Sequence, residues 1–332
     1  MKNITETTWP CGITLYKVED PRLVEVLAKF TGIQKQRHKR GTAYPFPGPN
    51  PVSIERADYP KFREQPYHIT EKTDGVRALM MITDIDDTHL VVVFDRTLTP
   101  YLFPIHEMPR ALYQGTLFDG EIVYDKVDSK WVFLCFDAIN IAGVPVFHLP
   151  FSERLCSISK SLHFYKDSPS DPGIIRPKMF MPLVPEIEPA FGAHVDSMRE
   201  RYDVDGVIFQ PEMDRVIYGR HDNLLKLKST HSVDFLVKNG KLNIYDETNK
   251  RNKVIGVPSG PQAHLATEGA IVECVPDGHG QWHVLHVRAD KHTSNNKLTL
   301  EKTLLNAREA LTLRDVLQGA FAVSAHGNPL WN

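Results

Sequence analysis

Short apolar runs separated by polar turns dominate the middle of this 332-residue chain. Runs of this kind that are rich in Val, Ile, Phe and Tyr predict β-strands. They lie at residues 67–70, 76–82, 89–95, 117–124, 131–137, 204–209 and 224–228. The polar segments 84–88 and 126–130 have the composition of hairpin turns. The pattern therefore predicts a largely antiparallel sheet core.

Helical spacing occurs between and around these runs. The predicted helices are residues 20–32, 151–164 and 187–201. The first begins with Asp20-Pro21, which combines a capping residue with a first-turn proline. Residues 176–183 have an extended pattern, residues 1–19 have no clear pattern, and residues 41–51, rich in proline and glycine, predict irregular connecting chain.

The pattern changes after Thr230, where short β-type runs follow one another without long helices. These runs are residues 233–237, 241–245, 270–275 and 282–287. Asn239-Gly240 separates the first two, and Asn-Gly between apolar runs is a strong hairpin signal. We expect a small barrel of the oligonucleotide-binding type with about five strands. A helix at 298–311 and a shorter one at 313–317 should follow.

Length and charge limit what these elements can do. A chain of 332 residues is long enough for two domains of ordinary size. The formal net charge is -2, so any contact with nucleic acid must come from a local basic surface. The densest basic run, residues 34–40, is a candidate RNA-contact patch or nuclear address, although such runs are more often solvated helix ends or loops.

The four cysteines are widely separated and form no Cys-x-x-Cys pair, so the sequence suggests neither a zinc site nor a disulfide framework. No apolar run approaches the roughly 20 residues needed to span a bilayer, and the N-terminus lacks the pattern of a signal peptide. We therefore expect an intracellular protein without membrane contact. It would be nuclear if cellular, and a viral origin is the other setting.

Lys72 opens the pattern Lys-Thr-Asp-Gly-Val-Arg between two predicted strands. Gly75 is available for a tight or left-handed turn, which would present the lysine at the tip of a loop. A lysine amine attacks an electrophile only when it is deprotonated, a state that partial burial and nearby cations favour. Taken alone, the segment is more typical of a surface turn than of a catalytic site, so its chemistry depends on other charged residues.

Charged residues stand at the ends of other predicted strands. They occur in Phe118-Asp119-Gly120-Glu121, Phe136-Asp137, Asp205-Gly206, Leu224-Leu225-Lys226-Leu227-Lys228 and Arg288-Ala289-Asp290-Lys291. In this order, and with the Lys72 segment, they resemble the covalent nucleotidyltransferase superfamily of ATP-dependent DNA ligases, RNA ligases and mRNA capping enzymes. The resemblance spans residues 45–295 and is strongest to the capping guanylyltransferases. The segment from His231 to Phe235 and the Arg-x-Asp-Lys pattern favour that branch.

The resemblance implies a fold of the α+β class. Residues 1–229 would form a nucleotidyltransferase domain of the ATP-grasp-like ligase and capping type, with antiparallel sheets, flanking helices and an N-terminal segment at 1–51. Residues 230–332 would form an OB-fold β-barrel domain with C-terminal helices.

The resemblance also implies roles for single residues. Lys72 would attack the α-phosphate of GTP. The nucleotide-binding residues would be Thr73, Arg77, Arg96, Glu121, Phe136, Lys178, Lys226 and Lys228. Arg77 and Glu121 would lie near the ribose, and Phe136 would stack on the purine. Arg96 would contact the ribose or a phosphate, and Lys178 would contact the guanine edge.

Basic and acidic groups would complete the site. Lys226 and Lys228 alternate with leucines, so both would face the same side of a strand and could clamp the α-phosphate. Arg288 and Lys291 would reach the β- and γ-phosphates when their domain closes, with Asp290 orienting them. Asp205 would bind Mg²⁺ or Mn²⁺.

The activity implied is mRNA guanylyl transfer, in which GMP passes from lysine to the 5′-diphosphate end of RNA. RNA triphosphatase and cap methyltransferase would be separate proteins, and RNA polymerase is a further candidate partner. Two alternatives stay open: an ATP-dependent DNA or RNA ligase, and a non-catalytic RNA-binding or scaffold module.

Overall fold

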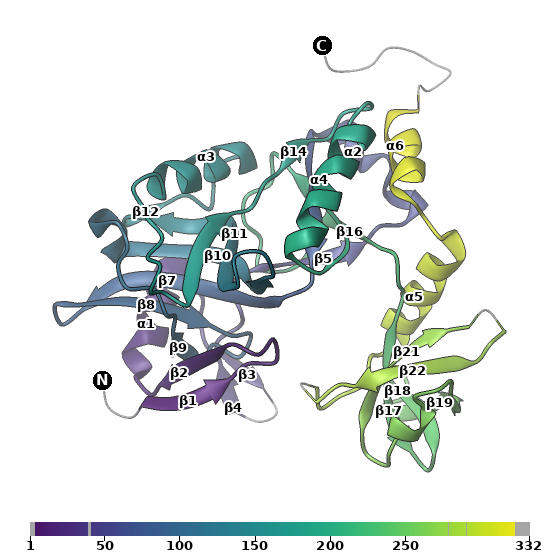
Figure 1. The fold of residues 1–332 in the computed structure, drawn as a ribbon. Coiled ribbons are helices and arrows are strands. Elements are labelled where there is room, and N and C mark those ends of the chain that lie inside the picture. The colour runs from purple at the N-terminus through teal and green to yellow at the C-terminus, as the bar shows by residue number, and fades with distance from the viewer. Residues whose placement is uncertain (1–3, 39–40, 278, 290, 323–332) are drawn as a thin grey trace. The chain divides into compact units, whose positions relative to one another are not determined.

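The computed structural model describes residues 4–38, 41–277, 279–289 and 291–322 (Figure 1). The chain divides into two compact units. Unit 1 comprises Met1–Val52, Pro60–Lys226 and Ala320–Asn332, and unit 2 comprises Ser53–Tyr59 and Leu227–Gly319. The assignment of residues 1–229 and 230–332 to a nucleotidyltransferase and an oligonucleotide-binding domain stays a prediction.

A nine-stranded, mainly antiparallel sheet forms the larger part of unit 1, in the order β1-β2-β9-β8-β7-β10-β11-β12 with β13 parallel to β11. Its strands are β1 (Ile4–Thr8), β2 (Thr14–Val18), β7 (Val76–Ile85), β8 (Thr88–Phe94), β9 (Pro100–Leu102), β10 (Gln114–Asp125), β11 (Lys130–Ile141), β12 (Val144–Pro145) and β13 (Gly173–Pro177). The runs predicted at 76–82, 89–95, 117–124 and 131–137 all lie in this sheet. Strands β1 and β2 had no counterpart in the sequence pattern.

A five-stranded sheet in the order β14-β6-β15-β16-β5 carries several of the candidate site residues. Its strands are β5 (Pro49–Ser53), β6 (Tyr67–Thr73), β14 (Met181–Pro182), β15 (Val204–Pro211) and β16 (Gly219–Lys228). Residues 44–48 are irregular chain, as predicted. The prediction was wrong for the rest of 41–51, which lies in β5 and in β4 (Gly41–Ala43), the partner of β3 (Gln36–His38). Lys39 and Arg40 of the basic run lie outside the described residues.

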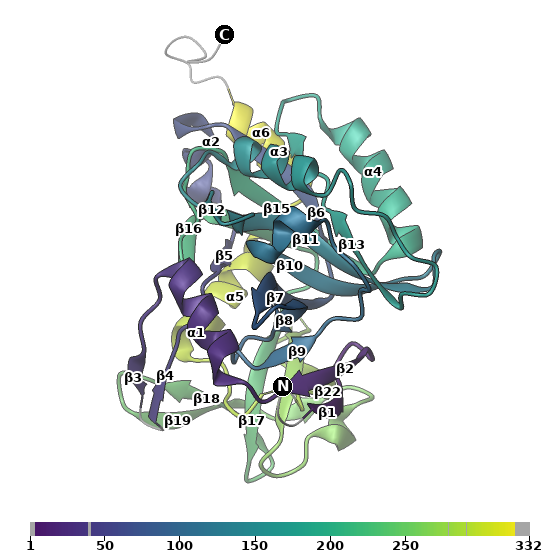
Figure 2. The ribbon, with the colours of Figure 1, turned by 90° about the vertical axis from the view of Figure 1, so that its left-hand side faces the viewer.

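The helices of unit 1 flank these sheets (Figure 2). They are α1 (Pro21–Thr31), α2 (Lys61–Glu64), α3 (Phe151–Ser161) and α4 (Glu188–Arg201), with a 3-10 turn η2 (Arg110–Tyr113). Helix α1 confirms its capping pattern: the Asp20 side chain accepts a hydrogen bond from the Arg22 amide, and Gly32 ends the helix at φ 68°. Helix α3 ends at Ser161, three residues before the predicted end.

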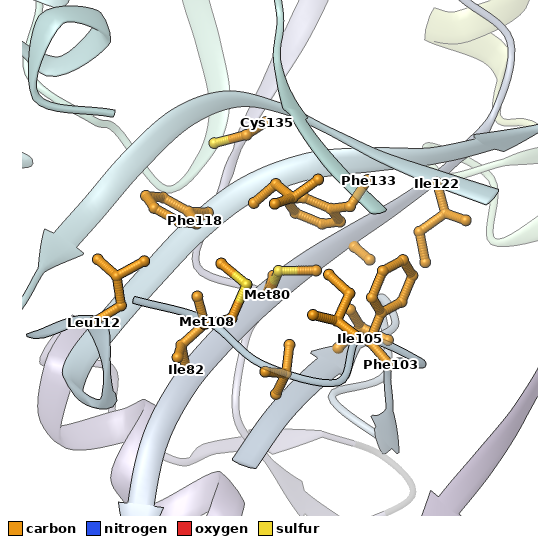
Figure 3. Close-up of a cluster of buried hydrophobic side chains, with 14 of the residues drawn as sticks. Met80, Ile82, Phe103, Ile105, Met108, Leu112, Phe118, Ile122, Phe133 and Cys135 are labelled. Atoms are coloured by element: carbon orange, nitrogen blue, oxygen red, sulfur yellow. The ribbon is translucent and has the colours of Figure 1, made fainter. Parts of the chain in front are cut away.

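Both faces of the central strand β7 are buried. Met80 and Ile82 of β7 pack on one face with Phe118 and Phe133 (Figure 3). Leu79 points to the other face, where it packs in a cluster with apolar residues of α1. Because neither face of β7 meets water, its sequence is a nearly continuous apolar run.

Unit 2 contains a six-stranded sheet in the order β19-β18-β17-β21-β22-β20. Its strands are β17 (Val233–Lys238), β18 (Lys241–Asp246), β19 (Arg251–Gly256), β20 (Pro258–Ser259), β21 (Ile271–Pro276) and β22 (Trp282–Val287). The predicted Asn239-Gly240 hairpin is confirmed, with φ of 52° and 65° at the two residues. Within the described strands no pairing of β19 with β20 closes the sheet, so the expected barrel is not confirmed.

Short helical elements complete unit 2. They are η1 (Arg56–Asp58), η3 (Ala263–Leu265) and α5 (Lys297–Glu309), and α6 (Leu313–Phe321) runs across the division between the units. Asn306, which the apolar pattern of α5 did not select, is buried and donates a hydrogen bond of 2.8 Å to the Ile54 carbonyl. Lys302 forms an ion pair of 2.6 Å with Glu55, so the segment Ser53–Tyr59 is joined to α5 by this ion pair and by the Asn306 hydrogen bond. No helix in the described ranges is long and apolar enough to cross a membrane.

Candidate active site

Lys72 lies within β6, next to the strand's last residue, and the prediction that it stands at a loop tip is wrong. Asp74 and Gly75 alone connect β6 to β7. Gly75 does not adopt a left-handed conformation. A Cβ at this position would lie 2.5 Å from Val123 Cγ1 and 2.6 Å from the Ile122 carbonyl oxygen, so glycine lets the turn approach β10 closely.

The amine of Lys72 is paired with a carboxylate. Its Nζ donates a hydrogen bond of 2.7 Å to Oδ1 of Asp205, near the start of β15. Strands β6 and β15 are antiparallel neighbours, with Lys72 opposite Gly206 and a register irregularity between Val204 and Gly206. The side chains of Lys72 and Asp205 are 21% and 28% exposed, so the pair is accessible to solvent.

A buried polar network surrounds the neighbouring residues of β6. Lys178 Nζ lies 3.0 Å from Thr73 Oγ1 and 3.0 Å from Glu71 Oε1, and His194 Nε2 lies 2.8 Å from Glu71 Oε2. Burial by itself would raise the pKa of Glu71, but the Lys178 charge and the hydrogen bonds from His194 and Lys178 outweigh it and lower the pKa below its ordinary value. Sequence reasoning selected Thr73 and Lys178 but missed Glu71 and His194. The contact of Lys178 with guanine stays a prediction.

Arg77 forms a two-pronged ion pair with Asp119. Its Nε and Nη2 donate to Oδ1 and Oδ2 at 3.0 and 2.5 Å, and Asp119 is only 1% exposed. Burial raises the pKa of Asp119, and the Arg77 guanidinium opposes that rise. The same guanidinium lies 5.3 Å from the ring centre of Phe136 and 5.4 Å from that of Phe46. Arg77 therefore lies close to two aromatic rings, and Phe46 had not been selected from the sequence.

Phe136 owes its position to a β-bulge. Asp137 pairs with Asp119 and Cys135 pairs with Gly120, so Phe136 is the extra residue of β11 between the two pairs. A bulge turns its extra side chain away from the regular alternation. The half-buried ring is thereby directed beside Arg77.

Glu121 and Arg96 belong to the same cluster. Glu121 lies opposite Arg77 in the β10–β7 pair and accepts a hydrogen bond of 2.5 Å from Thr73 Oγ1. Burial lowers the pKa of Arg96 and the Arg77 cation lowers it further, whereas Asp119 and Glu121 act in the opposite direction. The fold thus brings Arg96 within electrostatic reach of three charged groups of the cluster.

Lys226 and Lys228 are half-buried on β16, whereas Leu225 and Leu227 are buried, as the alternation predicts. Strand β16 is the neighbour of β15, which carries Asp205. The division between the units falls after Lys226. The candidate residues Arg288 and Lys291 belong to unit 2, and Asp290 lies outside the described residues.

Binding of magnesium by Asp205 stays a prediction. Among the described residues, no three or more His, Cys, Asp and Glu side chains form a group that could hold a metal by themselves. Mg²⁺ is commonly bound by one or two carboxylates, with substrate phosphates and water as further ligands. Asp205, which is partly exposed, meets that requirement.

Several known proteins are similar in sequence to this chain. The family model "mRNA capping enzyme, catalytic domain" matches residues 12–230. An mRNA-capping enzyme of Danio rerio is 33% identical over 211 residues, which cover 58% of this chain and 34% of the relative. The mRNA-capping enzyme subunit alpha of Neurospora crassa is 24% identical over 346 residues, which cover 84% of this chain and 85% of the relative.

The match spans about a third of the length of the first of these relatives. Among solved structures, a Chlorella virus DNA ligase-adenylate aligns with a TM-score of 0.39 and 14% identity, over 74% of this chain and 100% of the ligase. The family model, by contrast, covers more than half of the chain and includes Lys72, Glu121, Phe136, Asp205 and Lys226. The chain therefore belongs to the family of mRNA capping enzyme catalytic domains.

Proposed function

We propose that this chain is an mRNA guanylyltransferase that carries GMP on Lys72. The observation that carries the proposal is the Lys72 amine, 21% exposed and held 2.7 Å from Asp205. Aromatic and cationic groups of the kinds that bind a nucleotide cluster around β7, β10 and β11. The relatives named as mRNA-capping enzymes support the same activity.

The first step would form a phosphorus–nitrogen bond. The lone pair of Lys72 Nζ attacks the α-phosphorus of GTP, and the bond from that phosphorus to the bridging oxygen breaks. Pyrophosphate leaves with the electron pair, and the amine passes its proton to Asp205 or to solvent. In the second step a terminal oxygen of the 5′-diphosphate RNA attacks the same phosphorus, and Lys72 leaves and takes up a proton.

The other candidate residues would bind and orient the nucleotide. Phe136 would stack on the purine, with a contribution of about 1 to 3 kcal/mol. Lys226 and Lys228 would contact the α-phosphate, and Arg288 and Lys291 the leaving pyrophosphate. Mg²⁺ or Mn²⁺ bound at Asp205 would neutralise charge on the phosphate oxygens. In this proposal unit 2 is an OB-fold domain, and other proteins supply the triphosphatase and methyltransferase steps.

One incubation tests the proposal against its alternatives. The protein is mixed with Mg²⁺ and α-labelled GTP or ATP and run on a denaturing gel. Label from GTP that survives base but not acid is the expected result. Label from ATP alone would indicate a polynucleotide ligase, and no label would indicate a scaffold module.

The position of the adduct is tested by Lys72→Ala, which should abolish labelling. Lys130→Ala is the matched control, because Lys130 is also half-buried in a strand and makes a hydrogen bond of 2.8 Å to the Ser168 carbonyl. A Lys72→Ala protein that still takes up label would refute the assigned nucleophile.

A further inference from the structure

A nearly buried carboxylate in unit 2 binds both cations of the Arg288-to-Lys291 turn. Asp234, on β17, is 5% exposed. Its Oδ1 accepts a hydrogen bond of 3.1 Å from Arg288 Nη1, and its Oδ2 accepts one from Lys291 Nζ. Each carboxylate oxygen of Asp234 therefore binds one cation, and the carboxylate sets the spacing between the two cations.

The backbone around Asp234 fixes the same turn. The amide of Asp234 donates to Asn295 Oδ1 at 2.8 Å, and the amide of Asn295 donates to the Asp234 carbonyl at 2.8 Å. The amide of Arg288 donates to the Ile271 carbonyl at 2.8 Å. These hydrogen bonds tie Arg288 to β21 and Asn295 to β17, so they fix the backbone on either side of Lys291.

Glu273 on β21 provides a second carboxylate. Its Oε2 accepts a hydrogen bond of 3.0 Å from Arg288 Nη1, and its Oε1 accepts one from the Ser232 hydroxyl. Burial would raise the pKa of Glu273, but the hydrogen bond from Ser232 and the charge of Arg288 outweigh it and lower the pKa. Glu273 is therefore charged at neutral pH and holds Arg288 from a second side.

We propose that Asp234 is a positioning residue that sets the separation and direction of Arg288 and Lys291 for the β- and γ-phosphates of GTP. The inference rests on the proposed guanylyltransferase function. An ammonium has three N–H donors and a guanidinium has five, so each cation can bind Asp234 and a phosphate oxygen together. Without the carboxylate the two like charges repel each other, and long flexible side chains then lose their common orientation.

Asp234→Asn removes the charge and leaves one acceptor oxygen in a side chain of the same shape. The first measurement is the single-turnover rate of lysyl-GMP formation over a range of GTP concentrations. We expect this rate to fall about 10- to 100-fold, since small errors in placing groups around a reacting centre have effects of that size.

The second measurement separates positioning from general damage to unit 2. Enzyme carrying preformed lysyl-GMP is isolated after long incubation with GTP and is then given 5′-diphosphate RNA. No pyrophosphate leaves in this step, so Asp234→Asn should transfer GMP at the unmodified rate. Equal losses in both steps would overturn the proposal in favour of a purely structural role.

A double-mutant cycle adds a third readout. Asp234→Asn should cost less in an Arg288→Ala background than in the unmodified protein, because one of the two cations that Asp234 positions has already been removed. Fully additive losses in the rate of lysyl-GMP formation would contradict positioning.

Two further variants complete the design. Asp246→Asn is the control, because Asp246 is also 5% exposed in unit 2 but caps a turn through Thr248 and Asn249. This variant should leave both lysyl-GMP formation and GMP transfer to RNA unaffected. Glu273→Gln should give a milder form of the Asp234→Asn pattern, and it keeps the test decisive if Asp234→Asn fails to fold. If the unmodified protein takes no label from GTP, the proposed function fails. If it takes label and Asp234→Asn matches its rate, only the positioning role fails.

Discussion

Replacing Arg154 with leucine should strongly destabilise unit 1. Arg154 on α3 is 1% exposed, and its Nε and Nη2 donate to the two oxygens of Asp137 at 2.7 and 3.0 Å. Its Nη1 also donates to the carbonyls of Leu149 and Asp214. Leucine would leave the Asp137 carboxylate buried without its cation, next to the bulge that places Phe136.

Removing one partner of a buried ion pair costs about 3 to 5 kcal/mol. For a domain of this size each kcal/mol corresponds to roughly 2 to 4 °C, so the melting temperature should fall by about 6 to 20 °C. Calorimetry or thermal circular dichroism measures the shift. Arg199→Ala is the comparison, because the Arg199–Asp196 pair is 61% and 76% exposed and should contribute under about 1 kcal/mol.

A third variant tests the cause of the loss. Asp137→Leu combined with Arg154→Leu removes both charges, so it should be more stable than Arg154→Leu alone. If Arg154→Leu melts within about 2 °C of Arg199→Ala, the buried pair does not carry the stability inferred here.

Three further changes have defined outcomes. Gly75→Ala should lower the unfolding free energy by about 1 to 3 kcal/mol in urea denaturation, because its Cβ would clash with Val123 and the Ile122 carbonyl. The pKa of Asp214 is about 2, lowered from 3.8 chiefly by the hydrogen bond from His221. The ionised Asp214 therefore stabilises the folded protein above pH 4, and this stabilisation is lost as the pH falls towards 2. Asp214→Asn should flatten the decline of the unfolding free energy in an acid titration. Phe136→Ala should raise the GTP concentration for half-maximal labelling about 10-fold or more while Phe136→Tyr changes it little, and equal effects of both variants would count against stacking.

The central strands could be predicted because their local pattern and their burial agree. Both faces of β7 are covered, which gives a continuous apolar run bounded by polar turns. The prediction for β5 was wrong because the local pattern and the structure disagree there: its prolines favour irregular chain, yet the segment forms a strand. It lies at the edge of its sheet, where a missing amide is tolerated.

The local sequence could not show which distant residues form hydrogen bonds with the candidate site residues. Besides the adjacent Thr70 hydroxyl, Glu71 receives hydrogen bonds from Lys178 and from His194, and the latter is 123 positions away in the chain. Gly75 was selected as available for a tight or left-handed turn, but its close approach to β10 depends on a strand pairing that the turn itself does not encode. Closure of the unit 2 sheet into a barrel is likewise a long-range property, and the strand pattern does not decide it.

The hydrogen bond and ion pair that join Ser53–Tyr59 to α5 affect when unit 2 can finish folding during synthesis on the ribosome. Asn306 reaches Ile54 across 252 positions of sequence. At about 5 to 20 residues per second, Ile54 would be synthesised roughly 13 to 50 seconds before its partner. Unit 2 is therefore discontinuous, and no single proteolytic cut can release it whole from the rest of the chain.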